Sequence, residues 1–263
     1  MPFDEEISQG NRFGFGKNWL NFAKSIDKKK IEDSSDTLKK FYNIENFNDQ
    51  SFLDVGCGSG IFSLAACSLG AKTFSFDYDP HSVVCTKNLK NKYAADKNWQ
   101  IDKASILDSE YIESLGKFDF VYSWGVLHHT GDMNLAFSNV ARLVKDNGKL
   151  FIAIYNDQGI KSKIWRLIKK SYCSNFILKN IIILTYSILI LIPQYIKYLL
   201  TNRTLERGMN LYYDMFDWLG GYPFEVSTAE NVIKTFESKG FKLEKSNFVG
   251  SKLGCNEFVF VKV

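Results

Sequence analysis

The stretch FLDVGCGSGIFS at residues 52–63 constrains the fold more than any other part of the chain. Its apolar run ends in Asp54 and leads directly into Gly56, Gly58 and Gly60. Glycines at a turn from strand to helix let the backbone approach a ligand that a Cβ would exclude. The spacing is G-x-G-x-G, not the G-x-G-x-x-G typical of dinucleotide sites, and no G-K-[ST] follows. The stretch therefore predicts a ligand site that differs from those for dinucleotides and triphosphates.

The pattern around this loop alternates apolar runs with amphipathic stretches. We expect strands at 51–55, 72–77, 98–104, 117–123 and 149–155, with helices between them. A helix at 227–240, with a capping box of Ser227 and Glu230, precedes two strands at 241–249 and 256–263. The short connection between these strands predicts a hairpin, so the last strand runs antiparallel to its neighbours. The pattern predicts an α/β fold with a doubly wound, seven-stranded, mostly parallel sheet.

The chain divides into four segments on this basis. Residues 1–50 form an N-terminal helical lid region with two helices, and residues 51–156 form a Rossmann-like ligand-binding core. Residues 157–226 form a helical, basic and apolar insertion between strands five and six. Residues 227–263 complete the core. In RFGFGKNW (12–19), Arg12 and Trp19 either belong to a lid over the ligand or cover an apolar edge.

Charge and cysteine content narrow the class of protein. A net charge of +4 is too small to imply a nucleic-acid partner. The five cysteines form no C-x-x-C pair and have no histidine at ligand spacing, so we expect neither a metal site nor a disulfide framework. Scattered cysteines favour a reducing compartment, and the acidic start MPFDEEISQG differs from a secretory signal. We therefore expect a cytoplasmic protein.

Five motifs together give the chain a family resemblance. They are LDVGCGSG (53–60), FDYDP (76–80), ASILD (104–108), FDFVYSWGVLHHT (118–130) and KDNGKLFIAIYN (145–156). They resemble the class I S-adenosylmethionine-dependent methyltransferases, of the type that acts on quinones and natural products. The resemblance covers about residues 45–156. It implies a Rossmann-like methyltransferase fold, S-adenosyl-L-methionine as cofactor, and in-line transfer of a methyl group to a small-molecule or lipid-linked acceptor. Transfer to oxygen is favoured, with carbon and nitrogen left open.

The resemblance also implies which residues contact the cofactor. The three glycines pass the methionine part, Asp54 organises the loop, and Asp77 binds the ribose. The complete set of implied cofactor-binding residues is Asp54, Gly56, Cys57, Gly58, Ser59 and Gly60 in the loop, Asp77 and Tyr78 after the second strand, Ser105 and Ile106 beside adenine, and Ser123, Trp124 and Gly125 at the methionine end.

Three further residues are candidates for catalysis. His128 and His129 follow the fourth strand, near the expected methyl group, and a histidine can act as a base near neutral pH. We prefer His129, and the alternative is that one or both histidines only pack. Tyr155 follows the fifth strand, where it either orients the acceptor or caps a loop.

The insertion contains the apolar segment FILKNIIILTYSILILIPQYIKYLL (176–200), with seventeen uncharged residues between Lys179 and Lys197. A single membrane crossing would separate strands that belong to one sheet. Residues 157–207 carry nine Lys and Arg against two acids. Two interpretations stay open: the segment docks peripherally on anionic lipid at the inner face of a membrane, or it is a substrate lid or homodimer contact. Farther along, Trp218 is expected to anchor the insertion and Tyr222 to line the acceptor pocket.

Competing functions are a non-catalytic S-adenosylmethionine-binding module and a nucleotide-dependent oxidoreductase, which the glycine spacing disfavours. A nucleic-acid methyltransferase is disfavoured because SWGV (123–126) stands where such enzymes carry an N-P-P-Y motif.

Overall fold

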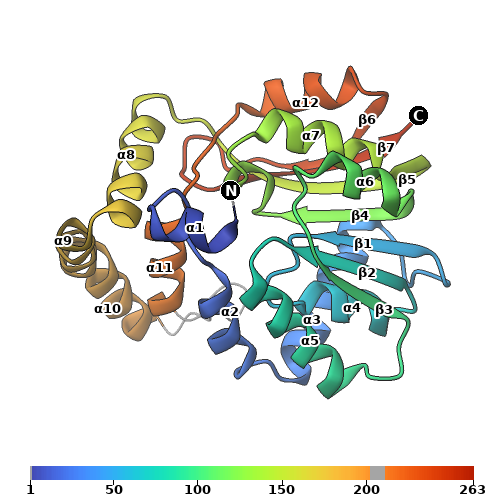
Figure 1. Cartoon of the computed structure of the whole chain (residues 1–263), viewed down its shortest axis with the longest axis horizontal. Coiled ribbons are helices and arrows are strands. Elements are labelled where there is room, and N and C mark those ends of the chain that lie inside the picture. The colour runs from blue at the N-terminus through green and yellow to red at the C-terminus, as the bar shows by residue number, and fades with distance from the viewer. Residues whose placement is uncertain (1, 202–210) are drawn as a thin grey trace.

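The computed structural model describes residues 2–201 and 211–263, and a seven-stranded sheet forms its centre (Figure 1). The strand order is β3-β2-β1-β4-β5-β7-β6. Strands β1 to β5 run parallel, and β7 runs antiparallel to both β5 and β6. This confirms the predicted fold class and the antiparallel last strand. The strands are β1 Ser51–Val55, β2 Lys72–Asp77, β3 Trp99–Lys103, β4 Phe118–Trp124, β5 Val144–Tyr155, β6 Phe241–Asn247 and β7 Cys255–Lys262.

Helices cover both faces of the sheet. One face packs against α6 (Ser109–Leu115), α7 (Met133–Arg142) and α12 (Ala229–Glu237). The other face packs against α3 (Lys28–Tyr42) and α4 (Ile61–Ser68), and α5 (Pro80–Tyr93) packs beside α4. These are the two layers expected of a doubly wound fold.

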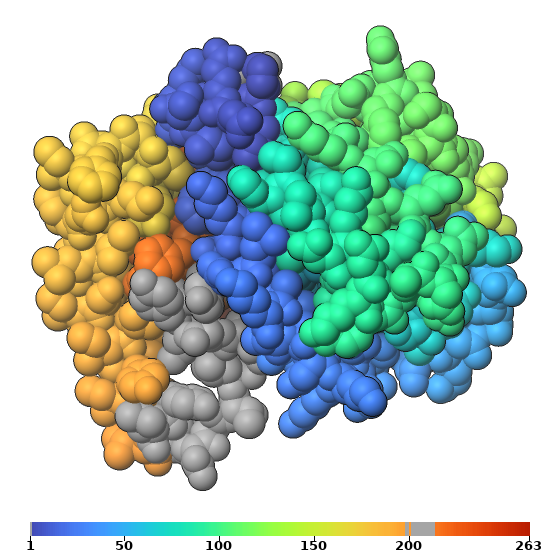
Figure 2. Space-filling model, turned by 60° about the horizontal axis from the view of Figure 1, so that its bottom comes forward, coloured from blue at the N-terminus to red at the C-terminus, as the bar shows by residue number. Residues whose placement is uncertain are grey.

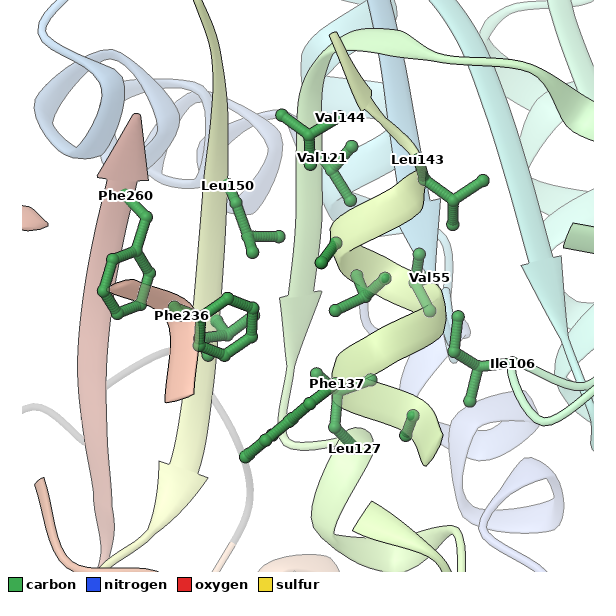
Figure 3. Packing of buried hydrophobic residues seen from close by; sticks show 14 of the residues in the cluster. Val55, Ile106, Val121, Leu127, Phe137, Leu143, Val144, Leu150, Phe236 and Phe260 are labelled. Atoms are coloured by element: carbon green, nitrogen blue, oxygen red, sulfur yellow. The ribbon is translucent and has the colours of Figure 1, made fainter. Parts of the chain in front are cut away.

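The central strands β1, β4 and β5 are apolar on both sides because both of their faces are covered. On β4, Phe120 and Tyr122 pack toward α3 and α4, whereas Val121 between them packs toward α7. Figure 3 shows the layer on the α7 side, in which Phe137 of α7 and Phe236 of α12 lie over the sheet. Alternation of this kind follows from the period-two geometry of a strand. The carboxyl ends of β1 and β4 lie side by side at the point where the order in which strands are added to the sheet reverses.

The N-terminal region contains three helices rather than the two expected. They are α1 (Phe3–Ser8), α2 (Gly16–Ala23) and α3. Asp27 caps α3 by accepting a hydrogen bond from the Lys30 backbone N–H, so α3 begins as a separate helix after α2 ends at Ala23. The first two helices lie between the insertion and the core, as Figure 2 shows.

The insertion is helical and lies at one end of the molecule (Figure 1). It comprises α8 (Ile160–Ser174), α9 (Phe176–Tyr186), a π-helical segment Ser187–Leu191, α10 (Ile192–Thr201) and α11 (Leu211–Gly220). By length and composition, Phe176–Lys197 is apolar enough to cross a membrane, and none of that window is buried. Arg203 and Arg207, which contribute to the basic charge of the insertion, lie outside the described residues.

Two local expectations are wrong. Strand β5 begins at Val144, five residues before the predicted start at 149, and includes the turn residues Asp146 and Asn147. The cap of α12 is Thr228, whose hydroxyl accepts from the Asn231 backbone N–H at 3.2 Å, in place of the predicted box of Ser227 and Glu230. Ser and Thr are both good cap residues, so the sequence does not decide whether Ser227 or Thr228 caps the helix.

Candidate active site

The glycine loop joins the end of β1 to the start of α4. Gly56 and Gly58 have φ angles of +77° and +54°, in the left-handed region that favours glycine. A Cβ on Gly56 would lie 2.5 Å from the methyl carbons of Val126, and one on Gly58 would lie 3.1 Å from the Trp19 indole nitrogen. Conformation and space therefore both require glycine here. The backbone of the loop is left open toward a ligand.

Asp77 ends β2 next to this loop. One carboxylate oxygen accepts from the Gly58 backbone N–H at 2.9 Å, and the other accepts from the Asp79 N–H at 2.8 Å. Burial raises the pKa of Asp77 to about 6, although these two bonds act to lower it. A carboxylate has about four acceptor positions, so further ones remain for hydroxyl donors of a ligand. This arrangement suits the paired hydroxyls of a ribose.

Asp54 lies below the loop, inside the sheet. The Ser63 hydroxyl donates to it at 2.5 Å and lies 2.8 Å from the Ser75 hydroxyl. Burial raises the pKa of Asp54 to about 7, and the charge of Asp77 adds to this rise. The bond ties β1 to α4. Asp54 thus fixes the strand and helix on either side of the loop.

The N-terminal segment is held over the site by contacts to several elements. The Gly16 N–H donates to Asp79 at 2.7 Å, and the Arg12 guanidinium donates to the carbonyls of His129 and Thr130 at 2.8 and 3.0 Å. Arg12 also pairs with Glu6. These contacts hold Arg12 and Gly16 against the elements that surround the glycine loop, and the lid role stays a prediction.

A single cavity of about 1200 Å³ connects the glycine loop to the insertion. Its donor end is formed by the loop and by Asp77, Ser105 and Ile106. Its far end is formed by Trp165 of α8, Tyr186, Ile190 and Gln194 of the helix that follows, and Asp214, Asp217 and Trp218 of α11. The helices α1 and α2 supply a third wall with Phe3, Phe15, Trp19 and Phe22. The space is large enough for two ligands to meet inside the protein.

Most residues expected from the sequence lie on this cavity wall. They are Asp54, Gly56, Cys57, Gly58, Ser59, Asp77, Tyr78, Ser105, Ile106, Trp124, Gly125, His129 and Tyr155. A Cβ on Gly125 would meet open space. The wall past β4 is therefore set back, as a bound methyl donor would require.

Three expected residues lie elsewhere. The Ser123 hydroxyl is fully buried and donates to the Val55 carbonyl at 3.1 Å, so it joins β4 to β1 within the sheet. Gly60 begins α4 against Thr86. His128 is fully buried behind the wall and packs against Tyr155 with the ring centroids 4.1 Å apart and the ring planes tilted by 47°, because the short helix Leu127–His129 turns only one of the two histidine rings toward the cavity.

His129 is held in one protonation form. Its Nδ1 lies 2.6 Å from the Pro223 carbonyl, which can only accept, so Nδ1 carries the proton and Nε2 is left as an acceptor. Burial lowers the pKa of His129 to about 3, with the charges of Lys169 and Arg12 adding to this effect. Burial also lowers the pKa of His128 well below its usual value. Both rings are therefore neutral at physiological pH.

The acceptor end is aromatic, with a buried lysine amine behind it. Lys169 of α8 donates to the Trp218 carbonyl, and its Nζ lies 4.2 Å from the Trp218 ring and 5.0 Å from the Phe224 ring. Trp165 and Tyr155 pack against Trp218 at 5.0 and 5.7 Å. Trp218 thus lines the cavity as well as anchoring the insertion. Tyr222, which was expected to line the acceptor pocket, is not among the residues that line this cavity, and its carbonyl accepts from the Phe13 N–H.

Several wall residues carried no recognisable sequence signal. Phe3 and Phe22 come from the N-terminal region, outside the stretch 12–19 that the sequence singled out, and Tyr186 and Gln194 come from a segment that was distinctive only by its hydropathy and the charge around it. Only the folded structure shows that residues from such distant segments line one cavity.

Comparisons with known proteins agree with this geometry. A family described as a methyltransferase domain matches residues 26–181. A ubiquinone biosynthesis O-methyltransferase from Pelagibacter ubique (strain HTCC1062) is 28% identical over 120 residues, which cover 46% of this chain and 48% of that protein. A protein of the same name from Xanthomonas oryzae pv. oryzae (strain PXO99A) is 31% identical over 105 residues, 40% of this chain and 42% of the relative. The chain spans about half the length of the curated relatives it matches.

Solved structures share the fold at low sequence identity. Magnesium protoporphyrin IX methyltransferase from Synechocystis PCC 6803, with bound SAH, is 13% identical, with a TM-score of 0.55 over 89% of this chain and 83% of that one. The [4+2]-cyclase SpnF is 11% identical, with a TM-score of 0.53 over 87% of this chain and 79% of that one. The fold therefore accommodates more than one chemistry, and the residues of the site must decide between them.

Proposed function

The chain belongs to the methyltransferase-domain family, and on that premise we propose that it transfers a methyl group from S-adenosylmethionine to an oxygen atom of a lipid-borne acceptor. The observation that carries this proposal is the single cavity, which joins an adenosine-type site at the glycine loop to an aromatic chamber under the insertion. The oxygen preference draws on the relatives named as O-methyltransferases.

The residues of the donor end fit this cofactor. Gly56 and Gly58 leave the backbone accessible, and Asp77 retains acceptor positions for ribose hydroxyls. Ser105 and Ile106 lie where adenine would rest, and the set-back wall at Gly125 leaves room toward the acceptor. When bound, S-adenosylmethionine supplies a methyl group on a positively charged sulfur.

The chain's own residues would then align the acceptor and exclude water. Trp19 and Phe15 close the cavity from the N-terminal side, and Trp218 and Tyr155 present flat apolar surfaces at the far end. The His129 Nε2 is an acceptor fixed by the Pro223 bond, so it can orient a hydroxyl group. Alignment and exclusion of water are the main demands of a displacement at carbon.

Binding of the cofactor product tests the donor half of the proposal. Isothermal titration with S-adenosylhomocysteine should give saturable binding, and NAD⁺ should give none. Asp77→Asn should weaken the first interaction. Binding of NAD⁺ in preference to S-adenosylhomocysteine would support the oxidoreductase alternative instead. Binding of S-adenosylhomocysteine without methyl transfer to lipid extracts or to isoprenoid catechols would favour a binding module.

We further propose that the insertion docks the enzyme on an anionic membrane surface. The helix from Phe176 to Thr201 is apolar on two faces. Its inner face contributes Ile182, Ile183 and Tyr186 to a cluster with Met215 and Leu219. Its outer face exposes large apolar side chains, among them Phe176 (80%), Ile177 (70%), Leu184 (62%) and Leu189 (69%). A surface helix in water normally keeps its outer face polar.

Charge complementarity supports lipid as the occupant of this surface. On the neighbouring α8, Ile160, Ile164 and Leu167 are exposed together with Lys161, Lys163, Arg166 and Lys170. An apolar face with cationic neighbours matches the interface of an anionic bilayer. Because Tyr186 and Ile190 of the same helix line the cavity, an acceptor could pass from the bilayer to the site along it.

Vesicle flotation tests this docking. The protein should float with vesicles of phosphatidylcholine and phosphatidylglycerol and remain below with phosphatidylcholine alone. The double substitution Lys161→Gln and Lys163→Gln should reduce flotation, whereas Lys242→Gln, on exposed β6, should not. If the protein does not float and sediments as a dimer, the apolar face of the insertion is covered by a second copy of the chain and not by a membrane. The location that follows from docking is peripheral, at the cytoplasmic face of the membrane.

A further inference from the structure

The acceptor end of the cavity contains a carboxylate to which the proposed function assigns no role. Asp217 lies on α11 and lines the cavity beside Trp218. Its Oδ1 accepts from the Asn18 side-chain amide at 2.8 Å. We propose that Asp217 removes the proton from the acceptor hydroxyl during methyl transfer, and that Asn18 positions the carboxylate for this step. The inference rests on the proposed function and names the proton acceptor of the same site.

The connection of Asp217, at the acceptor end, to the donor end of the cavity supports this role. Asn18 is next to Trp19 on α2, and the Trp19 indole lies against the glycine loop at Gly58. Helix α2 therefore reaches from the donor end to Asp217. A Cβ on Gly221 would lie 3.1 Å from the Asp217 carbonyl and 2.8 Å from His129 Cε1. The end of α11 that carries Asp217 thus lies near the oriented histidine.

The surroundings of Asp217 also suit a base. The groups that act on it are Asp214 on its own helix, Lys169 on α8 and Asn18 on α2, with the neutral His129 near the end of α11. Burial raises the pKa of Asp217 to about 7, the Asn18 bond lowers it, and the charge of Asp214 raises it further while Lys169 opposes this. A base with a pKa near the working pH is the most efficient kind.

The histidines are less suited to the same task. His129 has a pKa lowered to about 3, so its Nε2 can accept a hydrogen bond but holds a proton poorly near neutrality. His128 is fully buried behind the cavity wall. The sequence favoured His129 as the base, and the structure instead favours it as an orienting acceptor.

Proton transfer to Asp217 and methyl transfer to the acceptor oxygen are coupled in the proposed step. The acceptor's O–H proton moves to the Asp217 carboxylate, which becomes a neutral carboxylic acid. The electron pair left on that oxygen forms the new bond to the methyl carbon. The bond from this carbon to sulfur breaks and its electron pair stays on sulfur, so the positive charge on sulfur and the negative charge on Asp217 disappear together.

A binding experiment tests the location of the charge without any acceptor. S-adenosylmethionine is cationic at sulfur and S-adenosylhomocysteine is not. An ionised Asp217 near the reacting atoms should therefore favour the cationic ligand. The ratio of their dissociation constants should change by about tenfold between about pH 6 and about pH 8 in the wild type. In Asp217→Asn this change should largely disappear. Asp54 and Asp77 titrate in the same pH range, so the part of the change that belongs to Asp217 is the difference between the wild type and Asp217→Asn.

Turnover adds a second readout. The probe acceptor is a catechol carrying a short isoprenoid chain. Asp217→Asn should lower the rate of methyl transfer to this catechol by about 10²- to 10⁴-fold. It should also remove the acid limb of the pH profile, which is the fall in rate as the pH drops below the pKa of Asp217. Asn18→Leu should move that limb to higher pH, because the lost hydrogen bond had lowered the pKa of Asp217. Glu225→Gln is the matched control: the pKa of Glu225 is also raised by burial, yet it bonds the first turn of α7 through the Gly131 and Met133 N–H groups.

The outcomes separate the two proposals. A pH-independent ratio in the wild type, or a wild-type response in Asp217→Asn, overturns the role of Asp217 even where the catechol is not turned over. Failure of both ligands to bind at any pH overturns the proposed function itself. If Glu225→Gln also removes the pH dependence of the ratio of dissociation constants, that dependence comes from the fold around His129. This result would contradict the inference too.

Discussion

The side-chain amide of Asn18 donates to Asp217 at 2.8 Å and links two segments that lie 199 residues apart in the chain. It connects the N-terminal helix α2 to the insertion helix α11 across the cavity. The neighbouring Trp19 lies over the glycine loop at the same time. One short helix therefore contacts both the donor end and the acceptor end of the site.

Removal of the Trp19 indole should open the donor end. Trp19→Ala is expected to weaken S-adenosylhomocysteine binding by about tenfold, which corresponds to about 1.4 kcal/mol of lost contact. Lys17→Ala, an exposed change on the same helix, should leave the dissociation constant unchanged. Isothermal titration measures both. Equal affinities for the Trp19 variant and the wild type would rule out a lid role for α2.

The glycine loop should tolerate a side chain poorly at its first glycine. Gly56→Ala places a methyl group 2.5 Å from Val126 in addition to imposing a positive φ. Gly70→Ala has a φ of +84° but nothing within 4 Å, so it costs only the backbone strain of about 1–2 kcal/mol. Urea unfolding should show a larger loss of stability for Gly56→Ala than for the control. A smaller loss would mean that the loop can move away from Val126 at little cost.

Cofactor binding should weaken in acid as Asp77 becomes protonated. Its folded-state pKa of about 6 means that the acceptor form is lost as the pH falls through that value. S-adenosylhomocysteine affinity should therefore fall by up to about tenfold per pH unit below about pH 6. Asp77→Asn should bind weakly at every pH and show no such fall. Titrations over this range at constant ionic strength measure the effect, and a parallel fall in the variant would point to another group.

Lys169 should make stability depend on pH above neutrality. Burial lowers its pKa from 10.5 to about 7, so between these values the unfolded chain binds a proton that the folded chain does not. Unfolding free energy should therefore rise with pH in this window, by at most about 1.4 kcal/mol per pH unit. Lys169→Met should remove the rise. Urea unfolding of both proteins at about pH 7 and about pH 8.5 gives the comparison, and identical slopes would contradict a neutral buried amine.

The sequence predicted the donor half of the site better than the acceptor half. Gly56, Gly58 and Asp77 lie at the carboxyl ends of adjacent parallel strands, where local pattern and ligand chemistry coincide. Their placement on the cavity wall followed from the strand order alone. The cofactor roles assigned to them stay predictions until binding is measured.

The acceptor half depends on contacts that no local pattern encodes. His128 and His129 are adjacent in the chain, and only the turn of a short helix decides which ring reaches the cavity. Ser123 precedes Trp124 at the end of β4, yet its hydroxyl donates to the Val55 carbonyl inside the sheet. The bond from Asn18 to Asp217 joins the first and last quarters of the chain. Packing energy over the whole fold determines such arrangements, and a sequence window does not contain it.

The helix from Phe176 to Thr201 presents separate residues to the cavity and to the exterior. Its inward positions, such as Tyr186 and Ile190, can change with the shape of the acceptor while the outward positions remain apolar. Its outward positions, such as Leu184 and Leu189, can change with the surface that the protein meets while the chamber stays intact. Substrate range and subcellular placement could therefore diverge independently in descendants of this chain, through substitutions in one continuous helix.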